Sequence, residues 1–228
     1  MFLQLFSDCS MRILVYGFGP YREFHDNITA RIVRSLPSQA GLKKIIFPVR
    51  FQRRQFIDAL NRHRPDFVLG LGQSSRKRIE VESRAKNYRR ASKSKPWRPI
   101  LKGKPKSLPT SLPIHPGRWA GISTDAGDYV CNYSMFVLLE EIDRRQLRTS
   151  FGFIHIPYDF DYRKACRIVD RILRKFALLR VSEQLEPAFT PDSAVEIETA
   201  SAARSFRSED NGPVPLSKQP SWYPASNS

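Results

Sequence analysis

Two residues of this sequence have the types and the spacing of a nucleophile and its base. Cys131 lies in a Gly- and Asp-rich turn that opens into an amphipathic run, AGDYVCNYSMFVLLEEID. His155 follows 24 residues later, near the end of the apolar run GFIHIP. A thiol attacks as the thiolate, and both a helix N-terminus and an adjacent imidazole favour that form. The pattern predicts that His155 takes the thiol proton and later returns it to a leaving amine.

A carboxylate that holds the imidazole in the correct tautomer would complete this set, and Glu82 is the candidate. Backbone N–H groups near Cys131 would form an oxyanion hole. Each residue also has a structural explanation. A lone cysteine at a helix start is usually a small core residue, a strand histidine is more often structural than catalytic, and a single glutamate is most often solvated. Asp128 would oppose the thiolate if its side chain pointed at the sulfur.

The remaining cysteines and histidines indicate neither a disulfide framework nor a metal site. Three cysteines in 228 residues are too few for such a framework, so reduced thiols are expected. No CxxC pair occurs, and the four histidines lack the spacing of metal ligands. We therefore expect no metal and no cofactor.

Strand-sized apolar runs that alternate with helical patterns would position these residues. Strands are predicted at 12–16, 44–49, 67–71 and 151–156, and helices at 30–36, 52–63, from Cys131 onwards and at 162–179. This alternation implies βαβ units. The predicted fold class is α/β, a three-layer α/β/α sandwich with a mainly parallel twisted central sheet.

Ligands of an open α/β sheet bind beyond the carboxyl ends of the strands, which selects further candidates. Phe18, Tyr21 and Asn27 follow the first strand, and Gln73 follows the third, with Glu82 further on. Aromatic residues at such positions are more often part of the core or its rim than of a binding site.

Charge divides the chain into unequal parts. The net charge is +16, but residues 183–228 hold three basic and seven acidic residues, so the remainder carries +20. The stretch from Arg84 to Lys106 contains ten Lys or Arg residues and no acidic residue. Such a field attracts polyanions, whether or not binding them is the function.

Composition also suggests the domain boundaries. Residues 1–10 are interpreted as an N-terminal extension or the product of a misplaced start, residues 88–120 as a mobile, basic, Pro-rich loop, and residues 182–228 as a disordered tail. The start lacks the basic lead and cleavage site of a secretory signal, and no apolar run approaches the roughly 20 residues of a membrane span. We expect a cytoplasmic protein with no membrane partner.

The same residues carry a resemblance to a known family. The segments ILVYGFGPYREFHDN, FPVRF, RPDFVLGLGQ, IEVESRAKN, STDAGDYVCN and GFIHIPY resemble, in the family's order, the type I pyroglutamyl peptidases, also called pyrrolidone carboxyl peptidases. The resemblance implies a peptidase-like domain at 11–181 and a catalytic triad of Glu82, Cys131 and His155. It also places Phe18, Tyr21, Asn27, Gln73 and Tyr129 where the family shapes its substrate pocket.

The resemblance implies a cysteine exopeptidase that hydrolyses the bond after an N-terminal pyroglutamyl residue through a thioester acyl-enzyme. Its partners would be peptides with N-terminal pyroglutamate, and a homo-oligomer is implied as well. The substrate is a small uncharged lactam, so Phe18 and Tyr21 would flank its ring, while Asn27 and Gln73 would pair with its N–H and C=O groups. A free N-terminus would leave an unpaired cation in this pocket.

The chain departs from the family pattern at two places. LGQSSRK stands where the family usually has a Gly-rich LGQAGGR-like stretch, and it reaches the glutamate one residue sooner. The segment between Glu82 and Cys131 is shorter than usual and is basic and Pro-rich.

The alternative function is that of a binding module with weak or no catalytic activity. The stretch from Arg84 to Lys106 would engage RNA or another polyanion, and Tyr88 and Trp97 within it could stack on bases. A charge run is usually a solvated loop, and this one contains no RNA-binding motif.

Overall fold

The computed structural model describes residues 11–21, 25–115 and 117–185, and these form a six-stranded sheet. Its strands, in the order in which they lie side by side, are β2 (Leu42–Phe47), β1 (Ile13–Phe18), β3 (Phe67–Ser74), β8 (Ser150–Pro157), β4 (Ile79–Glu82) and β7 (Ala120–Ser123). β2, β1, β3 and β8 are mutually parallel, whereas β4 runs antiparallel to β8 and parallel to β7. The prediction of a mainly parallel sheet is confirmed.

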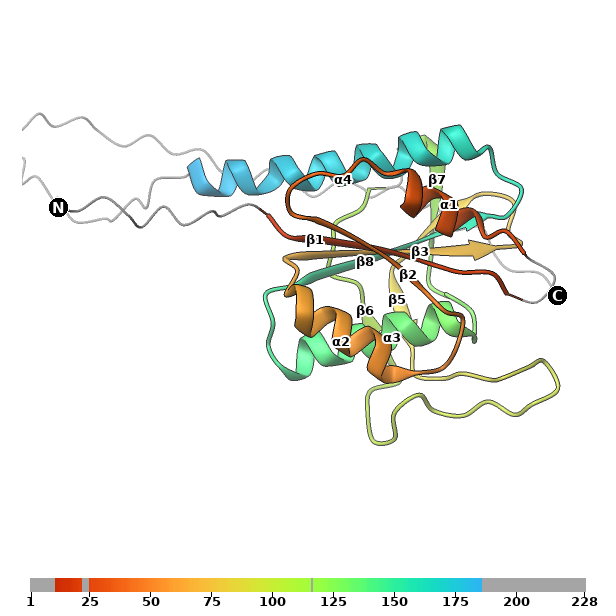
Figure 1. The fold of residues 1–228 in the computed structure, drawn as a ribbon. Helices are drawn as coiled ribbons and strands as arrows, with labels where there is room; N and C mark the ends of the chain where they lie inside the picture. The colour runs from red at the N-terminus through yellow and green to blue at the C-terminus, as the bar shows by residue number, and fades with distance from the viewer. Residues whose placement is uncertain (1–10, 22–24, 116, 186–228) are drawn as a thin grey trace, which may run out of the picture. The chain divides into compact units, whose positions relative to one another are not determined.

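Helices cover both faces of this sheet (Figure 1). α1 (Ile28–Ser35) and α4 (Tyr162–Leu185) pack on one face, where their aliphatic stripes meet Val15, Leu69 and Ile154. α2 (Arg53–His63) and α3 (Val130–Arg144) pack on the other face against aromatic side chains such as Tyr16 and Phe153. The three-layer sandwich is therefore confirmed. No helix in the described part of the chain is long and apolar enough to cross a membrane.

The central strands are apolar without alternation because helices bury both of their faces. Every residue of β1 is buried, as are all but the first residue of β8. β2 lies at the edge of the sheet, and its lysines leave it only partly buried. β2 begins at Leu42, two residues before the predicted start of this strand. Such a difference is within the usual uncertainty of element boundaries.

Four short strands were not predicted from the sequence. β4 has the sequence IEVE, whose period-two alternation buries Ile79 and Val81 among the aliphatic core residues. β7 pairs with β4, and a separate two-stranded sheet joins β5 (Arg84–Lys86) to β6 (Ser107–Pro109). These strands have three or four residues each, too few for a periodic signal to stand out.

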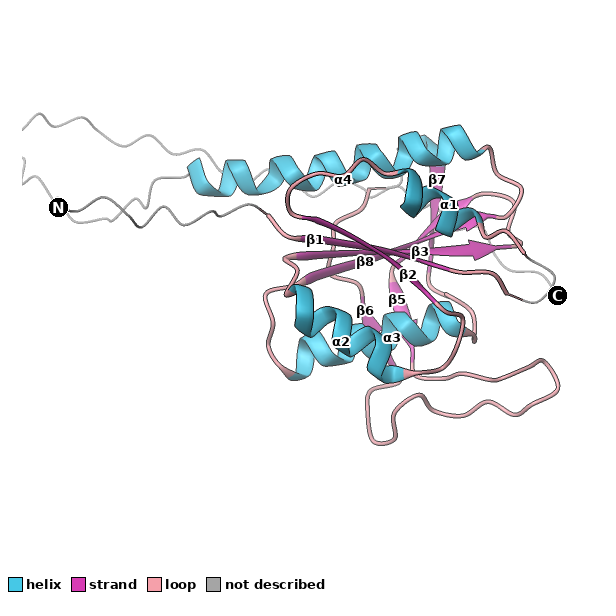
Figure 2. Cartoon of the chain, viewed as in Figure 1, coloured by secondary structure: helices cyan, strands magenta, loops and turns pink. Residues whose placement is uncertain are grey.

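The segment 88–120 is mostly loop and contains a few short regular elements (Figure 2). It contains β6, a short 3-10 helix at Gly117–Trp119 and a bridge between Arg89 and Arg98. The amide of Asn87 organises this segment: Nδ2 donates to the Leu101 carbonyl at 2.8 Å, and Oδ1 accepts from the Ile100 N–H at 2.9 Å. One side chain thus supplies several of the backbone hydrogen-bond partners of this basic, Pro-rich segment.

The predicted outer boundaries fall near the limits of the described residues. α4 continues to Leu185, four residues past the predicted end of the domain at 181. The segment 1–10 and residues 186–228 of the predicted tail lie outside the described residues.

Candidate active site

The carboxyl ends of β1, β3 and β8 and the start of α3 meet at a cavity of about 320 Å³. It is the position at which an open parallel sheet binds its ligands. Seven of the eight predicted site residues line it: Phe18, Tyr21, Asn27, Gln73, Tyr129, Cys131 and His155. The eighth, Glu82, lies behind His155 and does not line the cavity.

Cys131 is the second residue of α3 and is partly exposed. Tyr129 occupies the N-cap position without a side-chain hydrogen bond to the helix, so the first N–H groups of α3 are left for another partner. Ser134 fixes this turn from below: its Oγ donates to the Cys131 carbonyl at 2.8 Å and lies 3.0 Å from the hydroxyl of Tyr16 on β1. The thiol thus lies beside N–H donors that form no hydrogen bond with the described residues, on a helix that the Ser134–Tyr16 contact ties to the sheet.

His155 lies on β8 directly opposite Gly72 of β3. A Cβ atom at position 72 would be 2.8 Å from Nε2 of the imidazole and 2.7 Å from its Cδ2. Any larger residue would therefore displace the ring. Gly72 provides the space that the imidazole occupies.

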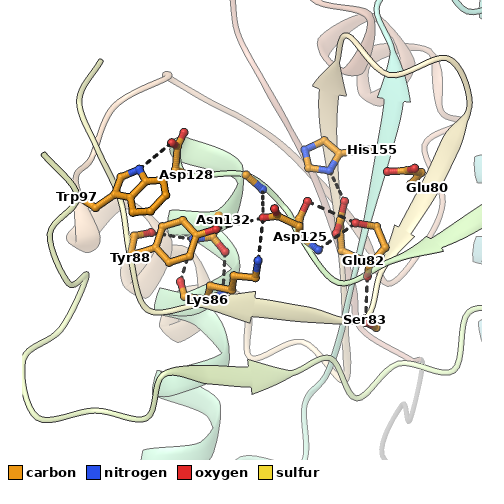
Figure 3. A network of polar contacts seen from close by, with 12 residues as sticks. Glu80, Glu82, Ser83, Lys86, Tyr88, Trp97, Asp125, Asp128, Asn132 and His155 are labelled. Carbon is orange, nitrogen blue, oxygen red and sulfur yellow. Dashed lines mark hydrogen bonds and ion pairs between the residues drawn. The ribbon is translucent and has the colours of Figure 1, made fainter. Parts of the chain in front are cut away.

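Glu82 contacts the far side of this imidazole. Its Oε1 atom lies 2.7 Å from His155 Nδ1, and both side chains are buried (Figure 3). The antiparallel register of β4 and β8 pairs Glu82 with Phe153 and Glu80 with His155, so these side chains share one face of the sheet. A reversed strand thus brings the carboxylate to the imidazole.

The pair has complementary pKa shifts. Burial lowers the pKa of His155, but hydrogen bonds to Cys131 and Glu82 outweigh it and raise the pKa to about 9. Burial raises the pKa of Glu82, but the hydrogen bond and charge of His155, together with Ser123 and Arg76, lower it overall. The geometry therefore favours a charged imidazolium beside a charged carboxylate.

Arg76 is a site residue that the sequence did not single out. Its Nη1 atom lies 2.9 Å from Glu82 Oε1 and 3.1 Å from Ser123 Oγ, and it also pairs with Glu80. The guanidinium thus contacts the same carboxylate oxygen as the imidazole. The available signal was its position just beyond β3, in the altered LGQSSRK stretch.

The carboxylate of Asp128, which could have opposed a thiolate at Cys131, is bound by residues of the basic segment. Arg90 forms an ion pair with its Oδ2 atom, to which Trp97 Nε1 also donates at 3.1 Å. Figure 3 shows the indole of Trp97 beside this carboxylate. The nearby Asp125 is held by the Tyr88 hydroxyl at 3.2 Å and by Lys86. The turn before Cys131 is thus fixed by the basic segment.

Aromatic rings form one wall of the cavity. The rings of Tyr21 and Tyr129 lie 5.0 Å apart between centroids, and Phe51 meets Tyr129 edge-on at 5.1 Å. Phe18 is almost fully buried and contacts Tyr16 at 5.8 Å. These rings make a wall that suits a flat apolar group.

The two amide residues of the cavity differ in what they can offer a ligand. Asn27 caps α1: its Oδ1 atom accepts from Thr29, and its Nδ2 atom donates to the Gly19 carbonyl at 3.2 Å. Gln73 Oε1 accepts from the Ile28 N–H at 3.0 Å, and its Nε2 atom makes no hydrogen bond to the described residues. Asn27 therefore supports the wall, whereas Gln73 has a free donor.

Cys131 and Cys166 are free thiols, and Cys9 lies outside the described residues. No group of three or more possible ligands in the described chain could hold a metal ion.

In the basic stretch, Tyr88 and Trp97 stack on each other with ring centroids 5.3 Å apart, and Lys86, Arg90 and Lys104 pair with carboxylates of the protein. These contacts give the RNA-binding alternative no support.

The fold and this site define a class, that of three-layer α/β/α proteins whose thiol, imidazole and carboxylate are arranged as in a cysteine hydrolase. Comparison with known proteins identifies the family within this class. The family model for pyroglutamyl peptidase matches residues 106–162. The pyrrolidone-carboxylate peptidase of Thermococcus kodakarensis is 30% identical over 198 residues, which cover 78% of this chain and 94% of that protein. The chain belongs to the pyroglutamyl peptidase family.

Solved structures agree with this assignment. A mutant pyrrolidone carboxyl peptidase from Pyrococcus furiosus superposes with a TM-score of 0.66 at 26% identity and covers 75% of this chain and 100% of that one. The enzyme from Thermococcus litoralis shares the fold with a TM-score of 0.68 at 22% identity and covers 79% of this chain and 99% of that one. The resemblance inferred from short segments is confirmed.

Proposed function

We propose that this protein is a cysteine exopeptidase that hydrolyses the amide bond after an N-terminal pyroglutamyl residue, through a thioester on Cys131. The observation that carries the proposal is the contact of 2.7 Å between Glu82 Oε1 and His155 Nδ1, with Cys131 and His155 lining the same cavity. Membership of the pyroglutamyl peptidase family supports the choice of substrate.

In the first half of the reaction, the sulfur of Cys131 attacks the carbonyl carbon of the pyroglutamyl residue. The open N–H groups at the start of α3 stabilise the oxyanion. His155 then gives its proton to the leaving amine, the C–N bond breaks, and a thioester remains. Glu82 keeps the imidazole oriented, because its Oε1 atom accepts the Nδ1–H hydrogen bond.

In the second half, a water molecule attacks the thioester. His155 accepts the proton of this water, the C–S bond breaks, and free pyroglutamate leaves. Cys131 and His155 return to their starting protonation states, so the two steps balance. The arrangement needs no metal or cofactor for this chemistry.

Specificity follows from the walls of the cavity. Phe18 and Tyr21 flank the lactam ring, and the free Nε2 donor of Gln73 pairs with the lactam carbonyl. Asn27 acts through the cap of α1 rather than by contact with the substrate. A peptide with a charged N-terminus would lose the hydration of its ammonium group here without gaining a partner. Peptides with N-terminal pyroglutamate are therefore the proposed partners.

The test is release of a fluorophore from a pyroglutamyl amide by the purified protein. Cys131→Ala should reduce the rate to background, whereas Cys166→Ala, which removes the other described free thiol, should retain the wild-type rate. Mass spectrometry of acid-quenched protein should find the acyl group on Cys131. Equal rates for wild type and Cys131→Ala would overturn the proposal.

The proposal includes a cytoplasmic location, which the small number of cysteines favours. It also includes assembly into a homo-oligomer.

A further inference from the structure

A second cavity, of about 640 Å³, opens between β5 and residues 99–107. We call it the basic hollow, because five basic residues and no acidic residue line it: Arg84, Lys86, Lys102, Lys104 and Lys106. Apolar and aromatic groups, among them Tyr88 and Leu101, also line it. Neither the fold nor the proposed chemistry requires such a concentration of like charge.

Only part of this charge is neutralised by the protein. Lys86 pairs with Asp125 at 3.4 Å, and Lys104 pairs with the buried Glu140 at 2.8 Å. Arg84, Lys102 and Lys106 form no ion pair with any described carboxylate. Three uncompensated cations around one cavity repel one another, and an anionic ligand would relieve that repulsion.

The basic hollow adjoins the active site through a shared wall. Ala126, Gly127 and Asp128 line the active-site cavity. The adjacent Asp125 bonds to Lys86 and Tyr88, which both line the hollow (Figure 3). A single turn of chain therefore separates the two cavities.

The direction of the substrate makes this proximity relevant. A pyroglutamyl residue is the first residue of its peptide, so the rest of the substrate leaves the site on the side of the departing amine. An extended chain advances about 3.3 Å per residue, so roughly two to four residues would carry it from the scissile bond across the turn.

We propose that the basic hollow binds acidic side chains of the peptide about two to four residues after the scissile bond, which makes acidic pyroglutamyl peptides the preferred substrates. This inference rests on the proposed function. The apolar and aromatic groups that line the hollow suit the backbone of an extended peptide, and the lysines and Arg84 supply the charge that its carboxylates need. Arg84, Lys102 and Lys106, the three cations without an ion pair to a described carboxylate, are the groups that favour acidic residues in the substrate peptide.

The experiment compares three pyroglutamyl peptides that share an alanine after the scissile bond and then carry three glutamates, three glutamines or three lysines. Formation of free amine is followed at low and high ionic strength. At low salt, kcat/KM should be roughly tenfold higher for the glutamate peptide than for the lysine peptide, with glutamine between them, because exposed charge pairs are individually weak. The ratio should shrink at high salt.

The double variant Lys102→Glu/Lys106→Glu should reverse this preference. The matched control is Arg171→Glu/Lys175→Glu, which makes the same change of charge on the exposed face of α4 and should keep the wild-type ratio. Circular dichroism of both variants checks that they are folded. A ratio near one in the wild type, or an equal change in both variants, would overturn the inference.

The small pyroglutamyl amide separates the two proposals, since it carries no residue that could reach the basic hollow. Wild-type protein that hydrolyses the amide but treats the three peptides alike contradicts the inference and leaves the proposed function intact. Failure to hydrolyse the amide contradicts both. If peptide charge has no effect but a single-stranded oligonucleotide binds in a manner that depends on Lys102 and Lys106, the hollow is a nucleic-acid site and the inference is wrong.

Discussion

Arg76 and His155 contact the same oxygen atom of Glu82. Arg76 Nη1 lies 2.9 Å from Oε1, and His155 Nδ1 lies 2.7 Å from it. A buried carboxylate would lose solvation as an anion, and the guanidinium offsets that loss without taking the place of the imidazole. We therefore expect Arg76 to be a positioning residue, one that acts on the proposed reaction through Glu82.

Replacement of Arg76 should show this indirect role. In Arg76→Ala the pKa of Glu82 should rise, because a favourable charge interaction is lost. We expect kcat to fall about tenfold with little change in KM, and the acidic limb of the kcat/KM profile to move to higher pH. Arg76→Lys should recover part of the loss. Arg78→Ala, which removes an exposed neighbour 3.9 Å from Glu80, is the control, and a similar effect there would contradict the assignment.

The raised pKa of His155 predicts the basic limb of the activity profile. The proposed mechanism needs a protonated imidazole to release the amine, so kcat/KM should fall as the pH rises through about 9. Glu82→Gln should move this limb to lower pH, because the carboxylate raises the pKa of His155. Glu80→Gln serves as the control, since Glu80 has no hydrogen bond to the imidazole. An unshifted limb in Glu82→Gln would count against the coupling of the pair.

The same ionisation should appear in protein stability. The pKa of His155 is raised above the ordinary value of 6.5, so the folded protein binds this proton more tightly than the unfolded chain. The contribution is complete below pH 6.5 and disappears as the pH rises through about 9. Denaturant unfolding of wild type and His155→Gln should therefore give a difference that declines over this interval. A difference that grows with pH would contradict the assignment.

Gly72→Ala should damage the site more than the fold. The added methyl group would meet the imidazole of His155 and the ring of Phe153, so the base must move. We expect kcat/KM to fall at least about a hundredfold, since misplacement by an ångström disrupts proton transfer. Gly70→Ala is the matched control, because it places a methyl group two residues earlier against Phe153 and Tyr16. It should lower the free energy of unfolding and retain more activity than Gly72→Ala.

Asn132→Ala should remove the hydrogen bonds that join the basic segment to α3, the helix that carries Cys131. The fully buried amide of Asn132 accepts from the Lys86 N–H at 2.8 Å and donates to the carbonyls of Lys86 and Tyr88. Its removal leaves three backbone groups without partners and should cost about 3 kcal/mol of unfolding free energy. Asn132→Asp keeps the acceptor but replaces the donor with a carboxylate oxygen that faces the carbonyls of Lys86 and Tyr88, so it should cost at least as much. Urea unfolding measures both variants, and a loss within experimental error would exclude this role.

Local sequence patterns were sufficient for the main elements of the fold. The apolar run at Phe67–Leu71 and the helical stripe after Cys131 depend on residue spacing alone, because buried strands and amphipathic helices have different periods. β4 was missed, although IEVE alternates, since four residues carry little periodic information. Its reversed direction depends on pairing with β8, which no local pattern encodes.

The sequence by itself determined which residues could do chemistry: a thiol before a helix, an imidazole on an apolar strand, and a glutamate inside a family-like segment. These properties belong to short stretches of chain. Only the tertiary structure decided which groups meet. Contacts such as Glu82 to His155, Arg76 to Glu82 and Trp97 to Asp128 join residues through strand reversal and loop closure. Such contacts depend on the packing of the whole sheet, because each partner is placed by a different element.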